Sequence, residues 1–77
     1  MTVMQKSYGD YRLTACPVLL NSGRWAVGVT IGRYTGGILR SESFYASDGI
    51  SYILEVEAEK EGINLGKNLI NSGRVGF

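Results

Sequence analysis

The side chains that usually carry catalysis are scarce in this sequence of 77 residues. It contains no histidine, which is the commonest general base and metal ligand in proteins. Its one cysteine, Cys16, has no basic neighbour in the sequence and no second cysteine for a zinc site or a disulfide. The glutamates between Glu55 and Glu61 fall in a segment expected to be helical, where they spread around the solvent side. We therefore predict a protein that is not an enzyme and binds no metal or cofactor.

Arginine and tyrosine side chains are the remaining candidates for contact with a partner. Arginine binds phosphate and carboxylate groups, and both residue types are enriched at interfaces. The net charge is only +1, whereas a dedicated nucleic-acid binder usually has a strong basic excess. The candidate contact residues are Arg12, Arg24, Arg33, Tyr34, Arg40 and Tyr45. We predict that they contact a protein partner or, as the alternative, DNA.

The chain is organised around one stretch, from Arg24 to Tyr34, that alternates in side-chain size. Bulky Trp25, Val27, Val29 and Ile31 alternate with small Ala26, Gly28, Thr30 and Gly32. Successive side chains of a strand face opposite sides of a sheet, so this pattern predicts a central strand with one bulky and one nearly bare face. We expect the bulky face to pack on a helix. The bare face is either the partner surface or an ordinary solvated face.

Two further strands are predicted beside this one. The first covers about residues 12–20, and Pro17 within it predicts either an edge strand or a break near Cys16. The third covers about residues 38–46, after the hairpin turn Gly36-Gly37. Its charged residues suit the other edge of the sheet, where charge discourages pairing with foreign strands. Residues 1–7 are expected to form a flexible lead-in.

A helix is predicted over about residues 54–72. Its apolar face would contain Ala58, Gly62, Leu65, Gly66, Leu69 and Ile70. Because glycine has no Cβ, Gly62 and Gly66 would let the helix approach either its own sheet or the helix of a second copy. Asn71-Ser72-Gly73 is expected to end the helix. Residues 50–58 also alternate as a strand would, so where the helix starts stays open.

Together these elements predict an α+β domain over residues 1–77, with a three-stranded antiparallel meander over about residues 8–47 packed against one C-terminal helix. A chain of this length buries only about 60% of its unfolded surface, which favours association, so a homodimer through the sheet face or edge is expected. No run of apolar residues is long enough for a membrane span, and the N-terminus does not resemble a secretory signal. With one cysteine, the sequence predicts a cytoplasmic protein.

The spacing of aromatic residues and glycines also carries a resemblance. Tyr8-Gly9-Asp10-Tyr11, Ser22-Gly23-Arg24-Trp25-Ala26-Val27 and Glu57-Ala58, followed by Gly62 and Gly66, resemble a group of small bacterial proteins of strand–strand–strand–helix order and unassigned activity. The same order is similar to the plant ethylene-response-factor DNA-binding domain and to the arm-type DNA-binding domains of phage integrases. That likeness implies a sheet in the major groove, read by Arg12, Arg24, Trp25, Arg33 and Arg40. The first strand lacks the arginine-rich run of those domains, so DNA binding is kept as the alternative.

Overall fold

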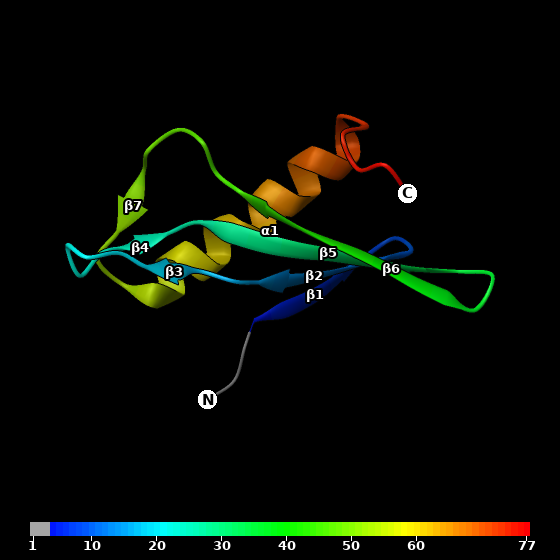
Figure 1. The fold of residues 1–77 in the computed structure, drawn as a ribbon, viewed down its shortest axis with the longest axis horizontal. Coiled ribbons are helices and arrows are strands. Elements are labelled where there is room, and N and C mark those ends of the chain that lie inside the picture. Colours follow the sequence, from blue (N-terminus) through cyan, green and yellow to red (C-terminus); the bar gives the residue numbers. More distant parts are fainter. Residues whose placement is uncertain (1–3) are drawn as a thin grey trace.

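The computed structural model describes residues 4–77 and shows an α+β fold in which one helix covers one face of an antiparallel sheet (Figure 1). The strands are β1 (Gln5–Tyr8), β2 (Tyr11–Ala15), β3 (Val18–Leu19), β4 (Trp25–Ala26), β5 (Gly28–Thr35), β6 (Ile38–Tyr45) and β7 (Ser51–Tyr52), and the helix is α1 (Glu55–Asn71). The main sheet has the strand order β1-β2-β5-β6, and a small sheet has the order β3-β4-β7. Within residues 4–77, no helix is both long and apolar enough to cross a membrane.

The main sheet has four strands, so the predicted three-stranded sheet is corrected by one additional strand. Residues 5–7 of the expected lead-in belong to β1, and residues 1–3 lie outside the described residues. Tyr8 pairs with Tyr11 across a two-residue turn in which Gly9 has a φ of 61°. A positive φ at that position suits the type II′ turns that join hairpin strands. β1 was not predicted, because its first three residues are polar and exposed, as residues of a loop are.

The first predicted strand is broken where its proline falls, as expected. β2 ends at Ala15, and β3 resumes at Val18, so Pro17 lies between the two strands and no ladder hydrogen bond is lost within either. The alternative expectation, an edge strand, is wrong for β2, which lies between β1 and β5. The pairing of β3 with β4 continues the β2–β5 register, and Cys16 N–H donates to the Gly28 carbonyl at 3.0 Å.

The small sheet forms beyond the end of β6. There β7 pairs with β4, in the position that β6 holds beside β5. Trp25 of β4 pairs with Tyr52 of β7, so the alternating residues 50–58 begin as a strand and continue as the helix from Glu55. Arg24 reinforces this pairing, since its guanidinium donates to the Ser51 hydroxyl at 2.8 Å and to the Ser51 carbonyl at 2.7 Å. Trp25 is half-buried and lies outside the buried cluster of the main sheet, which corrects the expectation that it belongs to the core.

Partial burial, followed by the nearby carboxylates of Glu61, Asp48 and Glu57, raises the pKa of the Tyr52 phenol above its ordinary value of 10.0. The folded protein therefore holds this proton more tightly than the unfolded chain does. The resulting stabilisation is complete below pH 10.0 and is lost as the pH rises through the raised pKa. We expect Tyr52→Phe to lose less thermal stability than the wild type between neutral and strongly alkaline pH. Identical alkaline profiles of melting temperature for the two proteins would contradict this prediction.

The helix begins and ends close to the predicted positions. Acidic Glu55 and Glu57 occupy its first turn, where the helix dipole favours negative charge. At its other end, Gly73 has a φ of 71° and donates to the Ile70 carbonyl at 3.1 Å, and Arg74 N–H donates to the Leu69 carbonyl at 3.0 Å. These two bonds form the Schellman motif, which uses carbonyls that the last turn leaves free. The predicted helix stop is confirmed.

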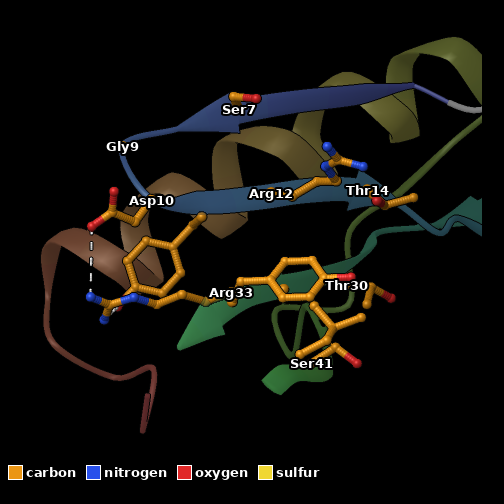
Figure 2. A pocket seen from close by; sticks show the side chains of 12 residues that line it. Ser7, Gly9, Asp10, Arg12, Thr14, Thr30, Arg33 and Ser41 are labelled. Carbon is orange, nitrogen blue, oxygen red and sulfur yellow. Dashed lines mark hydrogen bonds and ion pairs between the residues drawn. The ribbon is translucent and has the colours of Figure 1, made fainter. Parts of the chain in front are cut away.

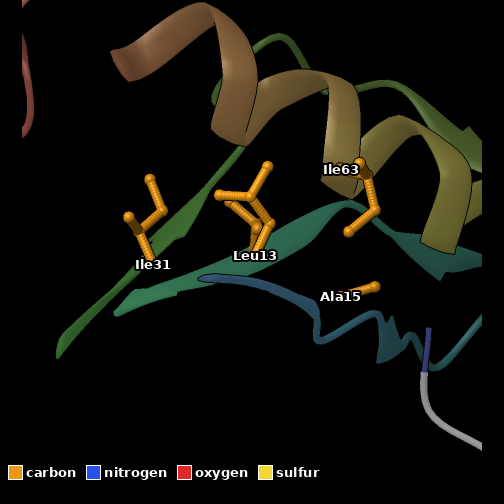
Figure 3. Packing of buried hydrophobic residues seen from close by; sticks show 5 residues of the cluster. Leu13, Ala15, Ile31 and Ile63 are labelled. Carbon is orange, nitrogen blue, oxygen red and sulfur yellow. The ribbon is translucent and has the colours of Figure 1, made fainter. Parts of the chain in front are cut away.

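The core lies between α1 and the centre of the main sheet. Its buried cluster contains Leu13, Ala15, Val29, Ile31 and Ile63 (Figure 3). Gly62 packs directly on the backbone of Gly28, and Gly66 faces Leu13 and Val29. Of the two roles proposed for the helix glycines, close packing on the chain's own sheet is therefore confirmed. Ile63 was absent from the predicted apolar face, although it is 4% exposed.

Candidate functional site

One face of the main sheet packs on α1, and no helix within residues 4–77 covers the other (Figure 1). The observed register separates the two sets of side chains because each strand alternates between the faces. The side chains of the uncovered face come from Gln5, Ser7, Arg12, Thr14, Gly28, Thr30, Gly32, Tyr34, Leu39, Ser41, Ser43 and Tyr45. We call this surface the open face. It is the bare face predicted from the alternation of the central strand.

The open face is hollowed around Gly32, with a volume of about 420 Å³ (Figure 2). A Cβ at Gly32 would meet no atom of another residue nearer than 3.7 Å, so the missing side chain leaves real space. Ser7, Thr14 and Ser41 add short side chains around it, and Arg12 extends over the same region (Figure 2). The hollow is therefore a product of short side chains on all four strands of the main sheet.

A row of polar groups beside the hollow runs from β6 through β5 to Cys16, which lies between β2 and β3. The Thr30 hydroxyl lies 2.9 Å from the Ser43 hydroxyl and 3.7 Å from the sulfur of Cys16. These contacts hold neighbouring side chains of β5 and β6 in fixed positions, since cross-strand hydroxyl pairs stabilise a sheet. This part of the open face is thus rich in hydroxyl groups that are held by hydrogen bonds.

Two tyrosines of the open face lie at different places along the sheet. Tyr34, on β5, is 71% exposed and borders the hollow. Tyr45, on β6, covers Gly28, because a Cβ there would lie 2.8 Å from a Tyr45 ring carbon. A larger residue at position 28 would displace that ring. Each tyrosine therefore presents an aromatic surface beside a glycine of β5.

Arg12 is the charged side chain of the open face. Its cross-strand neighbours are Ser7 and Gly32, so no carboxylate lies beside it in the sheet. Among residues 4–77, its guanidinium forms no ion pair and no side-chain hydrogen bond. Its donors are accordingly available to a carboxylate or phosphate group brought by another molecule.

Arg33 belongs to the opposite face, although Tyr34 beside it belongs to the open face. Its guanidinium lies 3.7 Å from the Asp10 carboxylate, donates to the Tyr11 hydroxyl at 3.3 Å and sits 5.1 Å from the Tyr11 ring centroid. The Tyr11 hydroxyl in turn donates to the Phe77 carbonyl. Arg33 thus ties the β1–β2 turn to the chain after the helix, at the end of the hollow (Figure 2).

The six predicted contact residues therefore separate into two groups. Arg12, Tyr34 and Tyr45 share the open face. Arg24 braces the small sheet, and Arg33 and Arg40 are cross-strand neighbours on the other face. Ser7 was missed because β1 was missed, although the turn dipeptide Gly9-Asp10 between two tyrosines was a usable hairpin signal.

The open face offers hydroxyl, aromatic and guanidinium groups, which suit binding. Within residues 4–77, no three histidine, cysteine, aspartate or glutamate side chains gather closely enough to hold a metal ion. The likenesses to small bacterial proteins and to sheet-based DNA-binding domains stay predictions. In comparisons of the chain with known proteins, no family model, no curated protein and no solved structure matches.

Proposed function

We propose that the protein is a non-enzymatic protein-binding module whose open face holds an extended segment of another protein. The segment places a carboxylate at Arg12 and an apolar side chain in the hollow, against Tyr34 and Leu39. The lone Cys16 supports a reducing, cytoplasmic setting. The hydroxyl, aromatic and guanidinium groups of the open face are typical of recognition surfaces, so the activity proposed is binding.

One observation carries the proposal, namely the composition of the open face. Tyrosine, serine, glycine and a single arginine are the residues that binding loops of antibodies use, since they combine rigid aromatic area with adaptable hydrogen bonding. Tyr34, Gly32 and the hydroxyl groups of Ser7 and Ser41 line the same hollow as Arg12. A guanidinium that forms no ion pair, beside a hollow lined in part by Tyr34 and Leu39, complements a partner with one carboxylate and one apolar side chain.

The charge of the open face suits DNA less well than a protein partner. A sheet that lies in the major groove needs several cationic side chains on its exposed face, because phosphate contacts supply most of the affinity. Of the five residues implied by the likeness to DNA-binding domains, the open face carries only Arg12. Arg33 is turned toward Asp10 and Tyr11 on the other face.

A site-specific crosslinking experiment tests the proposal. A photoreactive phenylalanine analogue replaces Tyr34, and in a control protein it replaces Lys60, which is exposed on the helix. We expect position 34, but not position 60, to crosslink one protein, whose affinity is then measured with purified components. Arg12→Glu should weaken that binding at least about tenfold, which is about 1.4 kcal/mol. Lys60→Glu should leave it unchanged.

Two results would overturn the protein-binding proposal. One is equal crosslinking from positions 34 and 60, followed by unchanged affinity in the Arg12→Glu variant. The other is binding of a fluorescent random-sequence duplex at low salt that falls steeply as salt is added, because release of counterions marks phosphate contacts. That second result would replace the protein partner by DNA.

A further inference from the structure

The outer edge of β6 is a long, unpaired strand edge. β6 is the last strand of the main sheet and runs for eight residues, from Ile38 to Tyr45. Every residue in it except Phe44 is exposed, and no strand among residues 4–77 lies on its outer side. Such an edge leaves backbone N–H and C=O groups free to pair with another strand. The outer edge of β6 is therefore available to a strand of another molecule.

The two charges of this strand have opposite sign. Arg40 and Glu42 point to the same face of the sheet, two residues apart and near the middle of β6. Charges on an edge normally prevent pairing with other strands, because most registers bury them without a counter-charge. A second copy of β6 that runs antiparallel, however, can set each charge against its opposite.

We propose that two copies of this chain dimerise by antiparallel pairing of their β6 strands, with the two-fold axis at Ser41. This register opposes Arg40 to the partner's Glu42, and Glu42 to the partner's Arg40. It also places exposed Ile38 beside the partner's Phe44 on the same face. Moving the axis to position 40 or 42 would instead oppose like charges, which destabilises cross-strand pairs.

The free backbone groups of β6 fit the same register. Ala46 N–H donates to the Val27 carbonyl at 3.0 Å, and this pair continues the β5–β6 register. The even-numbered residues of β6 therefore direct their backbone groups toward β5, and the odd-numbered residues direct theirs outward. With the axis at Ser41, the outward backbone N–H and C=O groups of one β6 strand lie opposite the outward groups of the partner's β6 strand. Arg40 and the partner's Glu42 then form a non-hydrogen-bonded pair, in which side chains approach most closely.

The helices leave room for this dimer. α1 packs over β2 and β5 and leaves β6 beside it (Figure 1). Strands are spaced about 4.8 Å apart, so the two helix axes would lie about 19 Å from each other across the joined sheets. A helix with its side chains is about 10–12 Å wide, and the two helices therefore do not collide. The joined sheet has eight strands, with both open faces on one side.

The proposed strand pairing is tested by measuring the sedimented mass of the wild type and of charge-reversal variants. Sedimentation of the full chain should give twice the monomer mass of 8.4 kDa. Arg40→Glu and Glu42→Arg, each alone, should weaken dimerisation about tenfold or more, since both symmetric pairs become repulsive. An equimolar mixture of the two variants should restore a dimer, because one copy then carries two negative and the other two positive charges. The doubly reversed chain should dimerise like the wild type.

A cysteine pair tests the register. In a Cys16→Ser background, Ser41→Cys should form an intermolecular disulfide under mild oxidation, because Cα atoms of a hydrogen-bonded pair lie about 5.5 Å apart. Ser43→Cys is the matched control on the same strand and face. Its thiols would stand four residues apart along the strand, about 13 Å, which is beyond the reach of a disulfide.

The dimer does not depend on the proposed partner of the open face. Arg12→Glu should leave the sedimented mass and the Ser41→Cys crosslink unchanged. A wild-type monomer at high concentration would overturn the inference, as would a mixture of the two reversed variants that stays monomeric. Crosslinking through position 43 rather than 41 would also overturn it, and so would masses above the dimer, which indicate head-to-tail pairing of β6 with β1.

Discussion

Gly62→Ala is expected to destabilise the fold by about 2–3 kcal/mol, as an added methyl group does in a filled site. The new Cβ would overlap the carbonyl oxygen of Gly28, which belongs to the central strand and cannot rotate away as a side chain can. The gain in helix propensity, about 1 kcal/mol for alanine over glycine, offsets only part of this cost. Urea denaturation followed by circular dichroism measures the difference.

Two matched variants separate close packing from a general effect of glycine replacement. A Cβ at Gly66 would lie 3.0 Å from a terminal methyl of Leu13, which can shift, so Gly66→Ala should differ from the wild type by about 1 kcal/mol or less. A Cβ at Gly76 meets no atom within 4 Å, and Gly76→Ala should be neutral. Equal losses at positions 62 and 66 would contradict the argument from Gly28.

The sequence pattern was sufficient for the elements that have strong periodicity. The size alternation from Trp25 to Ile31 identified the central strand and its two faces. The glycines at 62 and 66 indicated close packing of the helix, either on its own sheet or on a second copy, and the structure shows the first. Pro17 marked the break between β2 and β3. Each of these signals is local, because it depends on a backbone requirement of one residue or on a period within one element.

The elements that were missed depend on pairing between distant segments. β1 has no periodic apolar signal of its own, and it is held by β2, whose Leu13 lies opposite Lys6. The small sheet forms only because β7 returns to β4 after β6 has ended. In each case the partner strand supplies the stabilisation, so the propensity of the segment alone gives little indication of its structure.

The bare face of the sheet was predicted correctly, whereas the candidate contact residues were chosen without assigning each to a face. Grouping the arginines by charge placed Arg33 with Tyr34, although adjacent residues of a strand point to opposite faces. The period of two was already visible, since Arg33 continues the series of Val29 and Ile31. Face assignment before charge assignment would have removed Arg33 from the candidate contact residues of the bare face.

The second large effect is expected at Leu13, at the centre of the core. Its side chain is 0% exposed and packs against Gly66, with Val29 and Ile31 in the same buried cluster (Figure 3). Leu13→Ala should therefore cost about 3–4 kcal/mol, because a buried cavity adds to the lost transfer free energy. For a domain of this size that corresponds to a fall of roughly 15–25 °C in melting temperature.

Trp25→Ala is the comparison that locates the centre of stability. A tryptophan buried against the helix would cost about 3–5 kcal/mol on truncation. Trp25 is instead half-buried, paired with Tyr52 in the small sheet, and we expect a loss of only about 1–2 kcal/mol. Thermal denaturation of both variants measures the order. A larger loss for Trp25→Ala than for Leu13→Ala would place the dominant core at the junction of the small sheet and the helix. The predicted order follows from Leu13 being enclosed by the helix and two strands, whereas Trp25 has a partner strand but remains open to solvent.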